Sequence, residues 1–343
     1  MQRSDRKVEM ESKKTPNKAF AADRKKPRPL KSNVGKLNPK EERANKKMRS
    51  LLRAFILIFF FCSSAHAVSI DELSKTVVFL RQQSQEMEVK GDKTLEVWYR
   101  DPDSKEFSPK IITSSGTGLI IQYNKRDYLI TAKHVATALS PTAEIIINLS
   151  AGQSRSLTFK WLSQQEIIKG ARWFHHPKAD ISIHPMAYQD RFDLLAISED
   201  LFPKKDIEIT LLTPAYVLGF PMGLGVKEKL SPIAKGTLIA SRLTSIDSPG
   251  ISPDLQFILL DQALAQGYSG APVFYTEDIP SGITIGSQRM KGGEKLHFVG
   301  ILSASVSDKT GGKISLVTPI SYIWDILESS EFRKYEKGLE PKK

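Results

Sequence analysis

The sequence contains a single cysteine, Cys62, among its 343 residues. It also lacks an HExxH motif, a cysteine cluster and a phosphate-binding glycine loop, so the common sequence signs of zinc and nucleotide sites are missing. One cysteine cannot form an internal disulfide, so the fold must be stabilised by other means. We therefore expect an enzyme or binding protein without metal, nucleotide or other cofactor.

Long hydrophobic runs are also missing. The longest, residues 54–62, is about half of the ~20 residues needed to cross a bilayer. It follows Met48 and a charged region with Arg49 and Arg53, and it precedes an Ala-x-Ala site at residues 65–67. These are the parts of a secretory signal peptide.

We therefore predict a signal peptide over residues 48–67 that is cleaved after Ala67, so that the mature chain begins at Val68. Cleavage would remove Cys62 and leave no thiol in an oxidising compartment. The expected location is the periplasm or the extracellular medium, with no stable membrane span.

An excess of charge of one sign is missing from most of the chain, because positive and negative residues nearly balance after residue 50. Residues 1–50 contain 17 Lys and Arg against 6 Asp and Glu, whereas the remainder contains 33 against 32. The net charge of +12 thus belongs to the N-terminal tail, and the rest gives no electrostatic reason to expect nucleic acid. Residues 1–47 are predicted to be a disordered basic extension, unless translation starts at Met48.

A serine among small residues is the strongest functional signal. Residues 266–274 read QGYSGAPVF, which places Ser269 in a glycine-containing turn after the apolar run 257–260. Such a turn exposes the hydroxyl and leaves backbone N–H groups free, as a nucleophile and its oxyanion donors require. Upstream, the β-rich segment 128–135 (YLITAKHV) contains His134, a candidate general base.

An acid must orient this histidine, and two aspartates compete for the role. Asp180 follows a His-Pro turn, 46 residues after His134, at the start of an alternating strand pattern. Asp193 opens the apolar run 194–197 and is the rival. We favour Asp180 and interpret Asp193 as a strand-edge or surface acid.

The order His, Asp, Ser is that of chymotrypsin. The chain resembles the trypsin-like serine peptidases of the chymotrypsin fold, in particular the cysteine-poor bacterial and HtrA-type members without a PDZ domain. The motifs that carry the resemblance are residues 115–120 (SGTGLI), 217–225 (VLGFPMGLG), 236–241 (GTLIAS), 261–264 (DQAL) and 299–305 (VGILSAS).

The resemblance implies an all-β fold of two six-stranded antiparallel β-barrels within residues 68–343. The first barrel would cover about residues 75–200 and the second about 207–320. The apolar positions of the segment 321–336 have a helical period, so we expect a C-terminal helix there.

The resemblance also assigns roles around the serine. The backbone N–H groups of Gly267 and Ser269 would form the oxyanion hole, and Ala263 would lie at the floor of the specificity pocket. Because alanine carries no charge, cleavage after Lys or Arg is not expected. The segment Ser303, Ala304 and Ser305 would pair with the substrate backbone.

A metal site is the alternative interpretation of the cluster His175, His176, Asp180 and His184. His175 and His176 are adjacent and cannot easily face one ion together. Within the strand pattern that begins at Asp180, alternate residues share a face, so only Asp180 and His184 could face one ion. Two ligands fall short of a tetrahedral site. We expect no metal here.

The sequence therefore predicts an exported serine endopeptidase that cleaves protein or peptide substrates after a modest apolar residue. A catalytically silent module of the same fold, which binds an extended peptide or a partner protein, is the alternative. An esterase is disfavoured by the order of the three residues. The natural substrate and the oligomeric state are left open.

Overall fold

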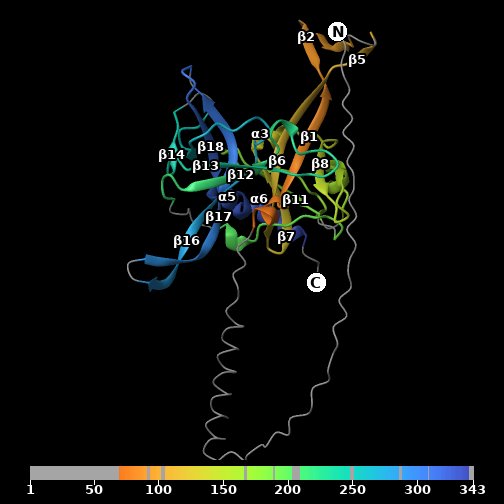
Figure 1. The fold of residues 1–343 in the computed structure, drawn as a ribbon. Helices are drawn as coiled ribbons and strands as arrows, with labels where there is room; N and C mark the ends of the chain where they lie inside the picture. The colour runs from red at the N-terminus through yellow and green to blue at the C-terminus, as the bar shows by residue number, and fades with distance from the viewer. Residues whose placement is uncertain are drawn as a thin grey trace, which may run out of the picture. The chain divides into compact units, whose positions relative to one another are not determined.

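The computed structural model describes residues 69–90, 93–101, 105–165, 168–187, 190–202, 209–247, 251–285, 288–307 and 309–339. The predicted signal peptide and the basic extension lie outside these residues. The described chain is mainly β-structure built on two antiparallel sheets (Figure 1). The all-β fold class predicted from the sequence is confirmed.

The first sheet takes its strands from the N-terminal half of the chain. Its central strands are β1 (Val77–Gln85) and β6 (Ile111–Tyr123). All of β1 pairs with residues 111–119 of β6, and both strands bury apolar residues where they cross the body of the sheet. In the order of the sheet, the strands are β10 (Phe174–His175), β11 (Ser182–Met186), β7 (Arg126–Thr131), β6 (Ile111–Tyr123), β1 (Val77–Gln85), β8 (Glu144–Asn148) and β9 (Ser154–Thr158).

Alternate residues on the strands of the second sheet point to opposite faces, and each face contacts a different apolar cluster. On β15, Ile258 and Leu260 belong to the cluster inside this sheet, whereas Phe257 belongs to the cluster shared with the first sheet. In the order of the sheet, the strands are β13 (Ile233–Leu238), β12 (Pro214–Gly219), β16 (Pro272–Ile285), β17 (Gln288–Ser307), β18 (Lys313–Pro319), β15 (Gln256–Leu260) and β14 (Thr244–Ser245).

Each sheet has seven strands where the resemblance implied six, because the two-residue strands β10 and β14 add a short pairing at one edge. Closure of the sheets is partial. Single bridges join Leu149 to Phe192 and Ile239 to Leu260, but no continuous ladder closes either sheet within the described ranges. The bridging segments are irregular, so the sheets curl towards barrels without complete closure.

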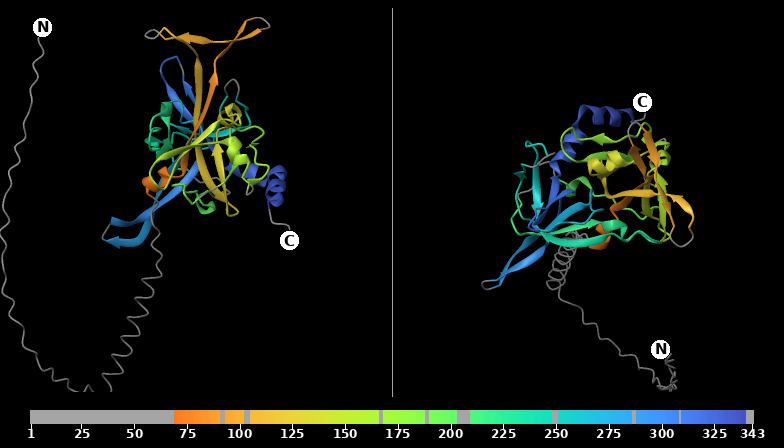
Figure 2. Two further views of the ribbon diagram at one scale, coloured as in Figure 1. Left: turned by 90° about the vertical axis from the view of Figure 1, so that its right-hand side faces the viewer. Right: turned by 90° about the horizontal axis from the view of Figure 1, so that it is seen from above.

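A branched extension between β1 and β6 is the largest departure from the sequence prediction. Beyond the sheet, β1 and β6 continue as a two-stranded stalk, and two small hairpins leave its top on either side (Figure 2, left). The hairpins are β2 (Met87–Lys90) with β3 (Lys93–Glu96), and β4 (Trp98–Arg100) with β5 (Phe107–Pro109).

The backbone groups of three residues hold this branch point together. The N–H of Glu86 donates to the carbonyl of Lys110 at 2.7 Å, the N–H of Lys110 to that of Val97 at 2.9 Å, and the N–H of Val97 to that of Glu86 at 2.9 Å. The cycle satisfies all six backbone groups at a point where no regular ladder could do so. Stalk and hairpins are therefore one hydrogen-bonded unit.

The helices are short and lie beside the sheets. The predicted C-terminal helix is broken at Ser329, whose extended backbone ends one helix and whose hydroxyl accepts the N–H of Phe332 to cap the next. No helix among the described residues is long and apolar enough to cross a membrane. The helices are α2 (Ile70–Ser74), α3 (Lys133–Ala138), α4 (Phe159–Ser163), α5 (Ser321–Glu328) and α6 (Ser330–Gly338), with 3-10 turns η2 (Glu199–Leu201) and η3 (Pro221–Gly223).

One buried histidine gives the fold a pH dependence. His184 on β11 is 4% exposed, packs against the rings of Phe159 and Trp173, and donates from Nδ1 to the carbonyl of Pro185 at 2.7 Å. Burial lowers the pKa of His184 to about 4. The folded state therefore binds fewer protons than the unfolded state at mildly acidic pH, where an unfolded histidine has a pKa of about 6.5.

We predict that the free energy of unfolding falls as the pH drops from about 6.5 to about 4, with His184 contributing about 3 kcal/mol of the loss. Urea unfolding at pH 7, 5.5 and 4.5, followed by tryptophan fluorescence, measures this loss. His184→Asn keeps a donor for the carbonyl of Pro185 but cannot ionise, so the variant should have a shallower pH dependence. Equal pH dependence in both proteins would contradict the prediction.

Candidate active site

His134 lies just after the end of a buried strand. β7 ends at Thr131, Ala132 starts a short turn of helix, and His134 is the second residue of α3. The buried neighbours Ala132 and Val135 fix the backbone, while 51% of the His134 side chain is exposed. The backbone at His134 is thus held in place by buried neighbours, while its imidazole ring lies at the surface.

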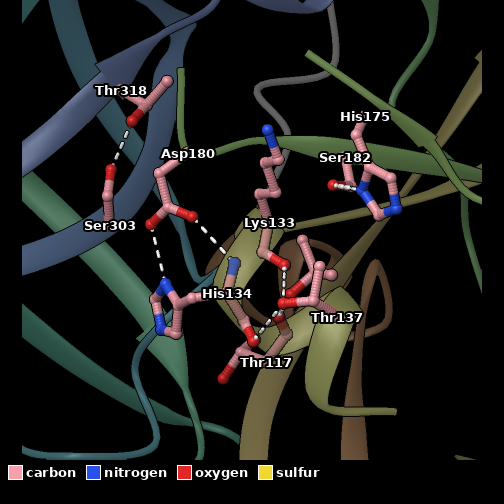
Figure 3. A network of polar contacts seen from close by, with 10 residues as sticks. Thr117, Lys133, His134, Thr137, His175, Asp180, Ser182, Ser303 and Thr318 are labelled. Carbon is pink, nitrogen blue, oxygen red and sulfur yellow. Dashed lines mark hydrogen bonds and ion pairs between the residues drawn. The ribbon is translucent and has the colours of Figure 1, made fainter. Parts of the chain in front are cut away.

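Asp180 contacts His134 twice, as Figure 3 shows. One carboxylate oxygen lies 2.7 Å from Nδ1 of the ring, and the other accepts the backbone N–H of His134 at 2.8 Å. Because a carboxylate can only accept, Nδ1 must carry the proton, which leaves Nε2 as an acceptor. The geometry is that of a histidine oriented to act as a base.

Asp193, the rival acid, lies elsewhere. Its carboxylate forms an ion pair with Lys75 at 2.8 Å, and its N–H donates to the carbonyl of Asn148 at 2.9 Å. Both contacts hold the irregular segment that partly closes the first sheet. Of the two aspartates, the structure brings Asp180 to His134.

Ser269 comes from the second sheet, three residues before β16. It lines a cavity of about 200 Å³ together with His134, Ser115 and Gln266. Within the described chain, no hydrogen bond links the hydroxyl of Ser269 to His134. Bonds of this kind are often long in proteins without substrate. The structure thus brings the serine and the histidine to one cavity without joining them.

The loop before Ser269 leaves two N–H groups available. The carbonyl of Gln266 accepts the N–H of Met222 at 2.7 Å, and the carbonyl of Tyr268 accepts the N–H of Ala271 at 2.8 Å. In a trans peptide the N–H points away from the carbonyl, so the N–H groups of Gly267 and Ser269 face the opposite direction. Neither donates a hydrogen bond to any described residue.

Two glycines are required by this loop. Gly267 has φ of +99°, and a Cβ there would lie 2.4 Å from the carbonyl oxygen of Phe220. Gly270 has φ of +83°, and a Cβ would lie 2.2 Å from the carbonyl oxygen of Thr117. Both the left-handed backbone and the close approach exclude other residues.

Thr117 on β6 connects this loop to the first sheet. Its N–H donates to the carbonyl of Ser269 at 2.9 Å, and its hydroxyl donates to the carbonyl of Gly267 at 2.8 Å. The same hydroxyl accepts the N–H of Phe220 at 3.2 Å, and the carbonyl of Thr117 accepts the hydroxyl of Thr131 at 2.8 Å. Thr117 is completely buried.

The residues predicted to bind substrate lie in two places. Ser303 is buried and shares a hydrogen bond with the hydroxyl of Thr318, whereas Ala304 and Ser305 are exposed. Ser303 and Ala304 line a second cavity of about 440 Å³ beside Asp180 and His134. The apolar side chains Ile251, Leu255, Phe257 and Leu316 form much of its wall.

Ala263 lies in a segment tied to β18 by hydroxyl groups. The hydroxyl of Ser315 donates to the carbonyl of Gln262 at 2.8 Å and accepts the N–H of Leu264 at 3.0 Å. It also lies 3.1 Å from the hydroxyl of Ser305. These contacts, with that of the Ser305 hydroxyl to the carbonyl of Leu264 at 3.4 Å, bring the segments of Ala263 and Ser305 close together.

Each of the three histidines that were considered for a metal site has its own partners. His175 contacts the hydroxyl of Ser182 at 2.6 Å, His184 is buried between aromatic rings, and His176 binds backbone groups of its own turn. Burial lowers the pKa of all three histidines. No group of three or more potential metal ligands occurs in the part of the chain that the structure describes.

Sequence reasoning missed the supporting residues of the site. Thr117 was visible only as part of a glycine-rich strand, and its partners lie about 100 to 150 residues away, as the separations of 103 and 150 for Phe220 and Gly267 show. Lys133 was visible only as the neighbour of His134. Its ammonium group donates to the carbonyl of His176 at 2.9 Å.

Comparison with known proteins gives structural neighbours only. No family model matches the sequence, and no curated protein matches it. Similar solved structures include the HtrA-type protease AlgW with a tripeptide, at 17% identity and a TM-score of 0.43 over 77% of this chain and 63% of that one. The chain thus spans less than two thirds of the AlgW chain.

Two further neighbours match over a larger share of their own length. The MamO protease domain from Magnetospirillum magneticum has 15% identity and a TM-score of 0.42 over 76% of this chain and 100% of that one. The inactive form of Rv3671c from M. tuberculosis has 13% identity and a TM-score of 0.42 over 81% and 94%. At these values the neighbours do not establish the activity of this chain.

We predict that Thr117→Val lowers the free energy of unfolding by about 3 kcal/mol, because two buried backbone groups lose their partner at about 1–3 kcal/mol each. Valine has nearly the same shape, so loss of packing is small. Chemical denaturation measures the change. Thr137→Val is the control, since this exposed hydroxyl bonds only within its own helix. Equal stability of the two variants would contradict the assignment of Thr117 as a structural link.

Proposed function

We propose that this protein is an exported serine endopeptidase that uses Ser269, His134 and Asp180. The observation that carries the proposal is the contact of Asp180 with Nδ1 and the N–H of His134, at 2.7 and 2.8 Å, beside a cavity that Ser269 also lines. An oriented base next to a half-buried serine that lines the same cavity is the arrangement that activates a hydroxyl for acyl transfer.

In the proposed mechanism, Nε2 of His134 takes the proton of Ser269 as its oxygen attacks the scissile carbonyl. The carbonyl oxygen becomes negative and is bound by the N–H groups of Gly267 and Ser269, each worth about 2.7–4 kcal/mol of barrier in comparable sites. His134 then returns the proton to the leaving amine, and water hydrolyses the acyl-enzyme. Asp180 keeps the proton of the ring on Nδ1 throughout.

Small apolar residues are the proposed preference at the cleaved bond. The hydroxyl contacts among Ser305, Ser315 and the segment of Ala263 hold the two walls of the proposed pocket close together, which favours a small side chain. The ammonium group of Lys235 lies 3.4 Å from the carbonyl of Ala263, and its positive charge disfavours a substrate Lys or Arg. The larger apolar cavity next to Asp180 would bind side chains elsewhere along the peptide.

Export is the part of the proposal that rests on sequence alone. The charged start, short apolar core and Ala-x-Ala site at residues 65–67 support a cleaved signal peptide. The mature chain would then act in the periplasm or outside the cell.

A silent peptide-binding module is the second candidate function. It is favoured by one observation, the missing hydrogen bond between the Ser269 hydroxyl and His134. In this case the exposed edge at Ala304 and the neighbouring cavity would still bind an extended chain.

Labelling with a fluorophosphonate decides between the two candidates. We predict that the probe modifies Ser269 and that Ser269→Ala lowers peptidase turnover by a factor on the order of 10⁶, with the fold retained. Peptide mapping of the labelled protein and a casein cleavage assay give both readouts. An unlabelled protein that still binds peptides would support the silent module instead.

We further predict that Asp180→Asn lowers turnover by about 10⁴-fold near neutral pH, because asparagine stabilises the wrong tautomer of His134. Asp193→Asn is the matched control and should retain nearly full turnover, since it loses the same charge but only the exposed pair with Lys75. Turnover on one peptide substrate, with folding checked by circular dichroism, compares them. Greater damage in the Asp193 variant would reject Asp180 as the orienting acid.

A further inference from the structure

His176 occupies an unusual position four residues before Asp180. Its side chain is buried, and Nδ1 of its ring accepts the backbone N–H groups of Ala179 at 2.6 Å and Lys178 at 3.2 Å. Backbone N–H groups only donate, so Nδ1 must be unprotonated and the proton must lie on Nε2. The turn that leads into Asp180 is therefore closed around one imidazole nitrogen.

The same turn is held from its other side by Lys133. The ammonium group donates to the carbonyls of His176 at 2.9 Å and Pro177 at 3.4 Å, and the N–H of His176 donates to the carbonyl of Ile181 at 3.1 Å. Lys133 directly precedes His134 in the chain. The turn is thus fixed to the backbone that carries the imidazole which Asp180 must orient.

Groups from three elements face the ring of His176. Asp325 on α5 lies 3.5 Å from Nε2, and the ring of Tyr322 on the same helix packs at 5.0 Å between centroids. Lys133 on α3 and Lys178 in the turn supply positive charge. Burial lowers the pKa of His176, the two lysines lower it further, and Asp325 opposes them. The ring is neutral at neutral pH.

We propose that His176 is a positioning residue for Asp180: its neutral ring holds the turn that places the carboxylate on His134, and protonation of Nδ1 releases it. This inference rests on the proposed function of the same site. A proton on Nδ1 would face two backbone N–H groups, so the acid form of His176 cannot keep either bond. Activity should therefore depend on two histidines at low pH, His134 as the base and His176 through the turn.

Two substitutions of His176 in the full-length chain test the proposal. His176→Asn places Oδ1 where Nδ1 was, so the acceptor is kept while the ionisation is lost. His176→Leu removes the acceptor. His175→Leu is the control, because His175 is exposed and contacts Ser182 rather than the turn.

The first readout is the rate at which a fluorophosphonate labels Ser269 as a function of pH. We expect His176→Leu to lower the rate by about 100-fold at neutral pH, the effect of displacing a reacting group by about 1 Å. His176→Asn and His175→Leu should label at about the wild-type rate. On the acidic side of the pH profile, the fall in the labelling rate should correspond to the uptake of two protons in the wild type and in His175→Leu. In His176→Asn it should correspond to the uptake of one proton.

The second readout does not depend on activity. The proton on Nδ1 of His134, which is donated to Asp180 at 2.7 Å, should give a far-downfield proton NMR signal that persists in His176→Asn and disappears in His176→Leu. Wild-type labelling and an unchanged signal in His176→Leu would overturn the proposal, as would a two-proton acid limb in His176→Asn. The latter test holds even if the leucine variant fails to fold. Absence of labelling in the wild type would instead reject the proposed function, while the NMR comparison still decides the role of His176.

Discussion

The hydrogen bonds of one buried threonine join the two halves of the candidate site. Thr117 belongs to the first sheet, yet its N–H and hydroxyl bind the carbonyls of Ser269 and Gly267 in the loop of the second. Through its own carbonyl it also binds Thr131, three residues before His134. A serine and a histidine that come from separate sheets are thus held by contacts to a single residue, whose burial keeps water from competing for those bonds.

The candidate site combines an anchored backbone with side chains that water can reach. The backbone around His134, Asp180 and Ser269 is anchored by buried neighbours, whereas the side chains of His134 and Asp180 are 51% and 30% exposed. Water therefore reaches the pair in the free protein. An extended peptide that lay across Ala304 would cover it and strengthen the contacts by excluding solvent.

The all-β fold was predicted from a resemblance that short motifs carry, and the candidates His134 and Ser269 from their local sequence. The alternating strands, the serine turn and the histidine after β7 are encoded within ten or so residues, as short segments such as QFILL at β15 show. The partners of Thr117 in the second sheet lie more than 100 residues away, and the bridges that partly close the sheets join Leu149 to Phe192 and Ile239 to Leu260. No local pattern encodes contacts at these separations. The branched extension was missed for another reason: its apolar side chains, including Trp98 and Phe107, are 52% and 66% exposed and resemble ordinary strand interiors in sequence.

The backbone cycle at Glu86, Val97 and Lys110 divides the extension into two parts. The hairpins beyond it can vary in length, whereas the stalk below it cannot. Because the cycle is complete in itself, a residue added at the tip of either small hairpin lengthens that arm and leaves the pairing of β1 with β6 unchanged. A residue added within the stalk would shift every side chain below it to the opposite face, down to Thr117 and its contacts. The two arms can therefore change in length and sequence independently of each other, while the stalk beneath them must keep its register.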